Sequence, residues 1–411
     1  GDSSQTWVPL MRRLARRYGK NEEAFPLAGL LPALLEELED EANDEAAAKE
    51  AAERERLLRR ALAGDGNEAP LETYYALLLM DGDRMGAILS GEDEAGTAIP
   101  FRESFHPQVR QAFDARASQH PTLERYGKQR RPVSPGRHLA ISAALGDFAQ
   151  TVARHVVEEE HLGRILYAGG DDVLAMLPVA DVLSCAQRLR HAYSGTLPED
   201  ADMDWGELAK DPAGLHCKNG FAWLRGRLMR MMGERATASC GVVIAHHQAP
   251  LSAVLRELRS AERRAKSEGG RNAFSLSILK RSGGALRFTA PWGEPLALLV
   301  ALRDFLAHED VSRRAVYHTL TWLADLPDPR AEKEMFRALL AYQFVRQSGP
   351  AWRTQANELA ERITLLATTC TGEARDWLAN YLAVAEFLAR QVRARTPAGT
   401  PIHVHSPQEV V

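Results

Sequence analysis

The sequence predicts an α+β protein whose middle region contains a sheet and whose two ends are helical. Short apolar runs alternate with helical patterns from about residue 74 to residue 280. The flanking regions are rich in residues that favour helices, and no alternating strand pattern persists there. A Gly-Gly-Asp-Asp run at 169–172 stands between two apolar runs, which is typical of a β-hairpin. These three observations set the expected organisation of the chain.

The composition is that of a globular protein with several domains. A chain of 411 residues is long enough for roughly two or three domains. The net charge of −4 excludes a chain that binds nucleic acid through its overall charge, so any such contact must be local. The sequence contains no run of eighteen apolar residues, so it predicts no membrane helix. We expect no membrane partner. The four cysteines form no C-x-x-C motif, which argues against a zinc site and fits a cytoplasmic location.

The first seventy residues are expected to form a helical segment. Residues 28–63 contain few helix breakers, and Leu30, Leu31, Leu34, Leu35 and Leu38 make an apolar stripe at helical spacing. The chain begins Gly-Asp-Ser-Ser without a methionine, so we expect it to be trimmed or to be part of a longer protein. We therefore assign 1–70 to a helical linker segment.

The middle region begins with a buried strand over 74–80, which leads directly into Asp81-Gly82-Asp83. Residues 91–135 are rich in Gly, Pro and charges and are expected to form loops. The pattern then predicts a helix at 137–160, the hairpin at 164–177, a helix at 179–194, a polar insertion at 196–220, a basic Met-rich helix at 221–234, a strand at 239–245, a helix at 250–266 and a strand at 273–279.

This order of elements is β-α-β-β-α-β followed by a further strand. It is the ferredoxin-like layout, an antiparallel sheet with helices on one face. In that layout strands 1 and 3 are central neighbours, so the hairpin tip lies near the end of the first strand. After Gly283-Gly284 the pattern becomes helical, and an independent helical bundle is expected over 294–395. We place the domain boundaries at 71–286 for the mixed region, 287–396 for the helical region and 397–411 for a flexible tail.

Two pairs of acidic residues are therefore expected at one end of the sheet. Asp81 and Asp83 follow the first strand, and Asp171 and Asp172 stand at the hairpin tip. Adjacent carboxylates repel each other unless a cation lies between them, and Mg²⁺ or Mn²⁺ with nucleotide phosphates suits such a site. Gly169 and Gly170 would let a ligand approach the backbone closely. The turn taken alone is equally compatible with an ordinary Asp-rich hairpin.

Lys266 adds a cation to this group. It lies near the end of the helix at 250–266 and precedes Gly269, Gly270 and Arg271. A lysine there can reach a triphosphate as a point charge. The simpler interpretation is a cation placed favourably at a helix C-terminus.

Five motifs occur in a fixed order. They are Asp81-Gly82-Asp83-x-Met85-Gly86, Ser134-Pro135-x-x-His138, the Gly-Gly-Asp-Asp hairpin, Ser239-Cys240-Gly241-Val242, and Ala265-Lys266-x-x-Gly-Gly-Arg271-Asn272-Ala273-Phe274. Together they resemble the second palm domain of the large subunit of type III CRISPR effector complexes, most closely the Cmr (III-B) branch. The resemblance implies a nucleotidyl-cyclase or polymerase palm over 71–286. Residues 1–70 would then be the linker between palms or a remnant of a first palm.

The family's palm converts ATP into cyclic oligoadenylates when the complex binds target RNA. The resemblance implies that Asp81, Asp171 and Asp172 are catalytic carboxylates that bind Mg²⁺ or Mn²⁺, with Asp83 as a further metal or cofactor contact. It also implies nucleotide contacts at Gly169, Gly170, Lys266 and Ser134, with His138 in a structural role at the helix start. Expected partners are small helical subunits, a guide-end-binding subunit, guide RNA and target RNA.

The sequence departs from the family, because the first palm and its cysteine-rich zinc segment are not evident. None of the thirteen histidines is followed by Asp, so the consecutive His-Asp pair of the family's nuclease domain is missing and we expect no DNase activity from this chain. Two alternatives stay open. One is a scaffold with a degenerate palm. The other is a diguanylate-cyclase-like enzyme, disfavoured because Asp172 and Val173 replace the Glu-Phe of that family's hairpin.

Local basic clusters are the candidates for RNA contact. Lys128, Arg130, Arg131 and Arg137 form a basic loop, and Arg225, Arg227, Arg230 and Arg235 fall on or near the expected helix at 221–234. Each cluster could contact a phosphate backbone. A solvated basic face is the simpler interpretation of each cluster taken alone.

Overall fold

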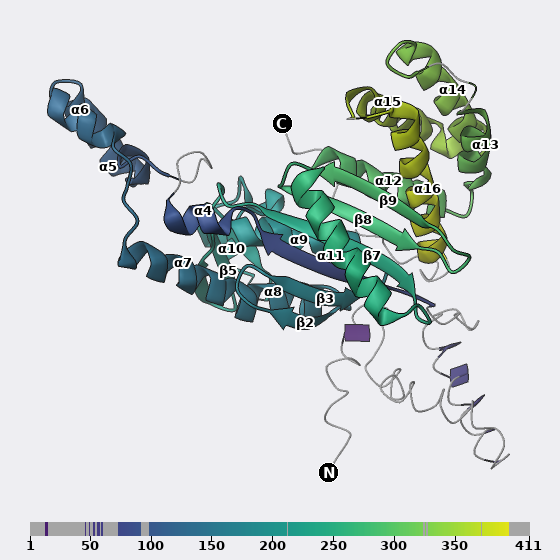
Figure 1. The fold of residues 1–411 in the computed structure, drawn as a ribbon, viewed down its shortest axis with the longest axis horizontal. Helices are drawn as coiled ribbons and strands as arrows, with labels where there is room; N and C mark the ends of the chain where they lie inside the picture. The colour runs from purple at the N-terminus through teal and green to yellow at the C-terminus, as the bar shows by residue number, and fades with distance from the viewer. Residues whose placement is uncertain are drawn as a thin grey trace.

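The computed structural model describes residues 73–91, 98–211, 213–323, 325, 328–370 and 372–393, with scattered single residues between 13 and 60. Figure 1 shows one large sheet in the middle of the molecule, helices on both of its faces, and a helical region at one end. Most of the helical region expected at 28–63 lies outside the described residues, and the few residues described there, between Ala46 and Arg60, are helical. The tail expected at 397–411 also lies outside the described residues.

The central sheet has six strands in the order β2-β3-β1-β7-β8-β9. Their bounds are β1 (Tyr74–Gly82), β2 (Arg164–Ala168), β3 (Val173–Leu177), β7 (Ala238–His246), β8 (Ala273–Leu279) and β9 (Ala285–Pro291). β1 pairs antiparallel with both β3 and β7, as the ferredoxin-like layout requires. The predicted fold class is thereby confirmed.

Helices cover both faces of this sheet, so the expectation of helices on one face was wrong. One face packs on α7 (Pro135–Asp147), on its continuation, and on α9 (Val182–Ser194). The continuation consists of η5 (Phe148–Val152), α8 (Ala153–His155) and η6 (Val156–Glu160). The other face packs on α11 (Leu251–Ser267), where Leu77 and Val243 meet Leu258. The reason is visible in β7, whose residues are all buried. A strand without alternating polar residues needs cover on both sides.

A small second sheet replaces the basic helix expected at 221–234, and that prediction was wrong. β4 (His216–Lys218), β5 (Phe221–Leu224) and β6 (Arg227–Arg230) form an antiparallel meander. Leu224 pairs with Arg227, which leaves a turn of two residues. Both turn residues have positive φ, 51° at Arg225 and 77° at Gly226, as a type I′ hairpin turn requires. This Arg-Gly turn was the signal that separates a hairpin from a helix.

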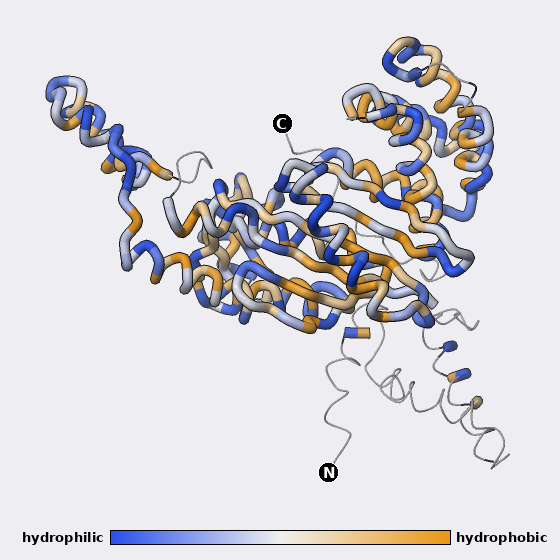
Figure 2. Tube along the Cα trace, viewed as in Figure 1, coloured by the Kyte–Doolittle hydropathy of each residue, from blue (hydrophilic) through white to orange (hydrophobic). Residues whose placement is uncertain are grey.

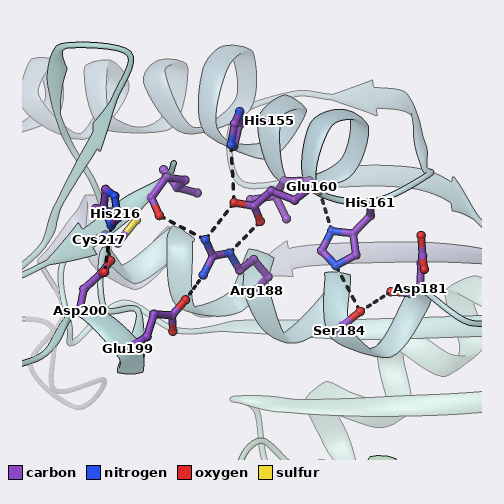
Figure 3. Close-up of polar contacts among 12 residues, drawn as sticks. His155, Glu160, His161, Asp181, Ser184, Arg188, Glu199, Asp200, His216 and Cys217 are labelled. Atoms are coloured by element: carbon purple, nitrogen blue, oxygen red, sulfur yellow. Dashed lines mark hydrogen bonds and ion pairs between the residues drawn. The ribbon is translucent and has the colours of Figure 1, made fainter. Parts of the chain in front are cut away.

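A polar network joins this second sheet to α9 and to the helix that precedes β2 (Figure 3). Arg188 binds both carboxylate oxygens of Glu160, at 2.7 and 2.9 Å, and also contacts Glu199. Asp200 accepts the backbone N–H of Cys217 at 2.5 Å and lies 3.1 Å from His216 Nδ1. The insertion is therefore fixed to the palm by buried and half-buried charges.

The region at 91–135 was expected to form loops. Its described part from residue 98 onward contains two helices. α5 (Pro107–Ala117) and α6 (Pro121–Lys128) each begin with a proline in the first turn, where proline is tolerated. Figure 1 shows both helices projecting away from the sheet. The remaining short elements are α4 (Met85–Ser90), α10 (Trp205–Leu208), η4 (Arg102–Ser104), η7 (Pro198–Asp200) and η8 (Pro350–Trp352).

The C-terminal helices share one hydrophobic core with the sheet. They are α12 (Glu294–Ala307), α13 (Arg314–Leu323), α14 (Lys333–Arg346), α15 (Arg353–Thr369) and α16 (Ala374–Arg393). β9 was not predicted, and it lies across the expected boundary at 286/287. Its Phe288 ring lies 5.6 Å from that of Trp377 and 5.2 Å from that of Tyr381 on α16.

Figure 2 shows hydrophobic residues concentrated along the central strands. Within the part of the chain that the structure describes, no helix combines the length and apolar character needed to cross a bilayer.

Candidate functional site

Three carboxylates meet where β1 ends beside the β2–β3 hairpin. Met80 pairs with Val173, so the residue after Met80 lies next to the hairpin tip. The tip is closed by the Gly169 N–H, which donates to the Asp172 carbonyl at 2.9 Å, and Gly170 has a φ of 102°. One oxygen from each of Asp81, Asp171 and Asp172 lies within 4.8 Å of the others. The structure thus brings together three of the four predicted acids.

The site concentrates negative charge in a half-buried position. Burial raises the pKa of Asp171, and the charge of Asp172 raises it further. Burial also raises the pKa of Asp172. Both shifts mean that the ionised carboxylates are costly at this place without a compensating cation.

The donor set fits a divalent cation. Mg²⁺ and Mn²⁺ prefer carboxylate oxygens, and two oxygens opposite each other on Mg²⁺ are about 4.2 Å apart at its usual bond length. The three oxygens here lie within 4.8 Å of one another, so a movement of the side chains could bring them onto one ion, whose other positions would be filled by water or phosphate oxygens. Asp81, Asp171 and Asp172 are the residues that would hold the ion.

Lys266 supplies a positive charge at the edge of this cluster. Its ammonium contacts Asp81 and lies 2.8 Å from Glu262 Oε1. Burial lowers the pKa of Lys266, and the charge of Arg271 lowers it further. The lysine therefore neutralises Asp81 in this arrangement.

Glu262 is a fourth carboxylate at the site, and the sequence analysis missed it. Burial raises the pKa of Glu262, and the charge of Asp172 adds to the rise. The helix that carries Glu262 lies very close to β7 at Gly241. A Cβ built on Gly241 would lie only 2.9 Å from the Glu262 Cα. The signal was its spacing, since residues four apart on a helix share a face and Glu262 precedes Lys266 by one turn.

Asp83 is not part of the carboxylate cluster. It is 3% exposed and accepts hydrogen bonds from Thr237 Oγ1, Ser239 Oγ and the backbone N–H of Asn272, at 2.7, 2.7 and 2.9 Å. These donors occupy both carboxylate oxygens. Asp83 therefore ties the end of β1 to β7 and to the turn before β8. The geometry gives no support to its predicted metal and cofactor contacts.

Gly82 allows the two halves of the site to approach. A Cβ at this position would lie 2.6 Å from the Tyr193 hydroxyl and 2.9 Å from the Asp171 Cβ. Tyr193 has little room to move because it is fully buried in the core, whereas Asp171 is half-buried at the hairpin tip. Any side chain at residue 82 would push Asp171 away from Asp81.

Ser134 and His138 lie on the helix that runs toward the hairpin tip. Ser134 caps α7 by accepting the Arg137 N–H at 3.2 Å, and His138 Nε2 lies 3.1 Å from the Leu89 carbonyl oxygen. Both residues line an open apolar cavity of about 680 Å³, together with Val133, Pro135, Leu139 and Ser142. Further along α7, Leu145 comes closest to a Cβ built on Gly170, at 3.7 Å. The cavity thus opens on the helix that passes the hairpin tip.

Several known proteins are similar to this chain. Residues 74–208 and 216–275 match the family "Cas10/Cmr2, second palm domain". The chain is 29% identical over 297 residues to the CRISPR system Cmr subunit Cmr2 of Pyrococcus furiosus, covering 71% of this chain and 28% of that protein. It is 32% identical over 128 residues to the corresponding Cmr2 of Saccharolobus solfataricus, covering 30% of this chain and 11% of that protein. The chain thus aligns with under a third of the length of either relative.

A solved structure shows the same fold. The type III-B Cmr-β complex bound to cognate target RNA, determined by cryo-electron microscopy, contains a chain that matches with a TM-score of 0.51 and 15% identity. The match covers 87% of this chain and 42% of that one. Motif order and sheet topology agree with this match, and the middle region of this chain is similar to the Cas10/Cmr2 second palm domain family.

Proposed function

We propose that this chain acts in the large subunit of a type III-B CRISPR RNA-guided effector complex and that its palm converts ATP into cyclic oligoadenylates. The observation that carries the proposal is the cluster of Asp81, Asp171 and Asp172 with Lys266 at its edge. Such a cluster at the tip of a Gly-Gly hairpin suits in-line nucleotidyl transfer between two ATP-derived groups. The Cmr2 relatives support the assignment to a Cmr complex.

The residues of the site have separable tasks in this proposal. Asp81, Asp171 and Asp172 hold Mg²⁺ or Mn²⁺, which screens the phosphate charge and acidifies the attacking ribose hydroxyl. Gly169 and Gly170 leave room for the nucleotide beside the backbone. Lys266 leaves Asp81 and contacts a phosphate. Ser134 and the apolar cavity beside it receive the nucleoside.

The partners follow from the same assignment. The relative solved with cognate target RNA belongs to a Cmr complex, and we propose guide RNA and target RNA as partners of the complex that contains this chain. Small helical subunits and a guide-end-binding subunit would complete it, in the cytoplasm.

The test uses the assembled complex with guide and target RNA. Labelled ATP or GTP is added with Mg²⁺ or Mn²⁺, and the products are resolved by chromatography. We expect cyclic oligoadenylates from ATP that disappear in the Asp171→Ala/Asp172→Ala variant. Arg259→Ala, an exposed change on α11 seven residues before Lys266, is the control and should leave the product yield unchanged.

Two results would contradict the proposal. Cyclic di-GMP as the product would assign the palm to diguanylate synthesis. Absence of any product from a complex that still binds target RNA would assign the chain a scaffold role with an inactive palm.

A further inference from the structure

Another cavity lies at the opposite end of β1 from the carboxylates. It has a volume of about 710 Å³ and is enclosed by the first residue of β1, the β8–β9 turn and helices α13 and α16. Tyr74 lines it, whereas Asp81 lies near the other end of the strand. At about 3.3 Å per residue, the two places are on the order of 20 Å apart. This cavity is therefore separate from the candidate site.

The inner wall of the cavity is apolar and aromatic. It is formed by Leu286, Val316, Leu320, Ala383 and Phe387. The Tyr74 ring packs edge-on against Phe387 at 5.1 Å, and the Tyr74 hydroxyl accepts the Arg281 N–H at 3.2 Å. Tyr317 stands at the rim with 53% of its surface exposed. Cavities of this size and lining bind ring-bearing small molecules.

The mouth of the cavity is positively charged. Lys280 and Arg281 extend from the β8–β9 turn, and Arg390 projects from α16, where it lies 5.2 Å from the centre of the Phe387 ring. Among the described residues, none of these three cations forms an ion pair. They are therefore available for an anion.

The one carboxylate in the wall is already matched. Glu386 is 7% exposed, and its Oε1 lies 3.1 Å from Arg313 Nη1. Because this pair is internally neutral, the three cations leave the cavity with a net positive charge.

We propose that this cavity binds a nucleoside phosphate, with the base against the apolar wall and Tyr317 and the phosphate on Lys280, Arg281 and Arg390. A bare phosphate would leave most of the volume and the aromatic wall unused. An uncharged hydrophobic ligand would leave three cations without a partner. Cations near aromatic faces match the two halves of a nucleotide. The source is either a free nucleotide or the end of an RNA strand, since both present the same chemistry.

The test is a binding titration in which the carboxylate cluster of the palm is disabled. The chain carries Asp171→Ala/Asp172→Ala, and EDTA is present at about 0.15 M salt, where weak surface contacts are screened. The probes are AMP, ATP, a 5′-phosphorylated RNA pentanucleotide, inorganic pyrophosphate and a pentaglutamate peptide. We expect metal-independent binding of the nucleotide probes. Because the palm is disabled, this result does not depend on oligoadenylate synthesis.

Three variants separate the contribution of the phosphate contacts from that of the base contact and provide a control. Lys280→Ala/Arg281→Ala should weaken every phosphate-bearing probe at least about tenfold. Tyr317→Ala should weaken AMP and the RNA but not pyrophosphate, because only the former offer a base for stacking. Arg314→Ala, an exposed change at the start of α13 that does not line the cavity, should change nothing. Thermal unfolding of each variant checks that the fold is retained.

The outcomes decide both the proposal and the source of the ligand. AMP or ATP binding more tightly than RNA identifies a free nucleotide, and the reverse order identifies an RNA end. Three results overturn the proposal: no nucleotide binding up to about millimolar concentration, binding that ignores Lys280→Ala/Arg281→Ala, or pentaglutamate that competes as well as AMP. The last would make the cavity a site for an acidic protein segment.

Discussion

Single residues decide whether the carboxylates can meet, and Gly82 is the clearest case. In Gly82→Ala the added methyl would lie 2.6 Å from the Tyr193 hydroxyl and 2.9 Å from the Asp171 Cβ. We expect the hairpin tip to shift and the affinity for Mn²⁺ to fall roughly 10–100-fold, as when the support of a metal ligand is disturbed. Isothermal titration of the purified chain with Mn²⁺ measures this.

Gly86→Ala is the matched control for that change. Gly86 is also a glycine close to the site in sequence, yet a Cβ there meets no atom within 4 Å. It should leave Mn²⁺ affinity and thermal stability within experimental error. Equal affinities of the Gly82→Ala and wild-type chains would show that the hairpin tip does not depend on this close approach.

Lys266 should have opposite effects on the binding of metal and of ATP at the carboxylate cluster. It pairs with Asp81 in the structure, so it competes with a divalent cation for that carboxylate. Lys266→Met should raise the affinity for Mn²⁺ without nucleotide roughly fivefold, or about 1 kcal/mol, because the competing ion pair is lost. In the assembled complex the same variant should raise KM for ATP, because the phosphate contact is lost.

Arg259→Met on the same helix controls for the general loss of a positive charge. It is exposed and should change neither quantity. An unchanged Mn²⁺ affinity in Lys266→Met would count against the competition between lysine and metal.

At the scale of elements, the network around Glu160 joins three parts of the fold. They are the helix that precedes β2, the helix α9, and the second sheet. Burial alone would raise the pKa of Glu160, but hydrogen bonds from His155 and Arg188 lower it to about 2. A carboxyl whose folded pKa lies below its unfolded value of 4.5 stabilises the protein above pH 4.5. This contribution, roughly 3 kcal/mol, should be lost as the pH falls from 4.5 toward 2.

The comparison of Glu160→Gln with the wild-type chain isolates this effect. Urea unfolding followed at several pH values should show a smaller fall in stability between pH 4.5 and 2 in the variant. Arg188→Ala should destabilise at neutral pH by about 3 kcal/mol or more, because it leaves a buried carboxylate without its partner. Parallel pH profiles for Glu160→Gln and wild type would refute the role assigned to this carboxyl.

The sequence predicted the elements whose signals are local. The hairpin at 164–177 was recognised from its Gly-Gly-Asp-Asp turn, and the motif order led to the correct sheet, confirmed by its topology and the family match. The hairpin at 221–230 was mistaken for a helix because Arg-Gly is a less common turn pair than Asn-Gly or Asp-Gly, so its signal was weak. Asp83 was assigned to the metal site because its partners, Thr237 and Ser239, lie more than 150 residues away in the chain. Contacts of that kind leave no pattern in a single sequence.

At the scale of the whole molecule, the palm and the C-terminal helices form one core. Phe288 is 3% exposed and contacts Trp377 and Tyr381 across their boundary. Phe288→Ala should destabilise the protein by about 3 kcal/mol or more, since a large cavity would remain. Because the core is shared, both regions should lose stability together.

Denaturant unfolding followed by tryptophan fluorescence and by far-ultraviolet circular dichroism tests this. The two probes should give coincident transitions in the wild-type chain, and both should shift in Phe288→Ala. Tyr342→Ala, at an exposed position on α14, is a control that should shift neither. Two separate transitions in the wild-type chain would mean that the palm and the helices unfold as independent units.

The position of β1 at the centre of the sheet has a consequence for synthesis on the ribosome. Leu78 pairs with Ala175 on one side and with Val242 on the other, so its second neighbour is made much later. Asp81 can meet Asp171 once the hairpin has emerged, whereas Lys266 arrives only after α11. Non-local pairings of this kind fold slowly, and an incomplete sheet exposes unpaired edges. In the nascent chain the acidic cluster can therefore form before the lysine that neutralises it has been made.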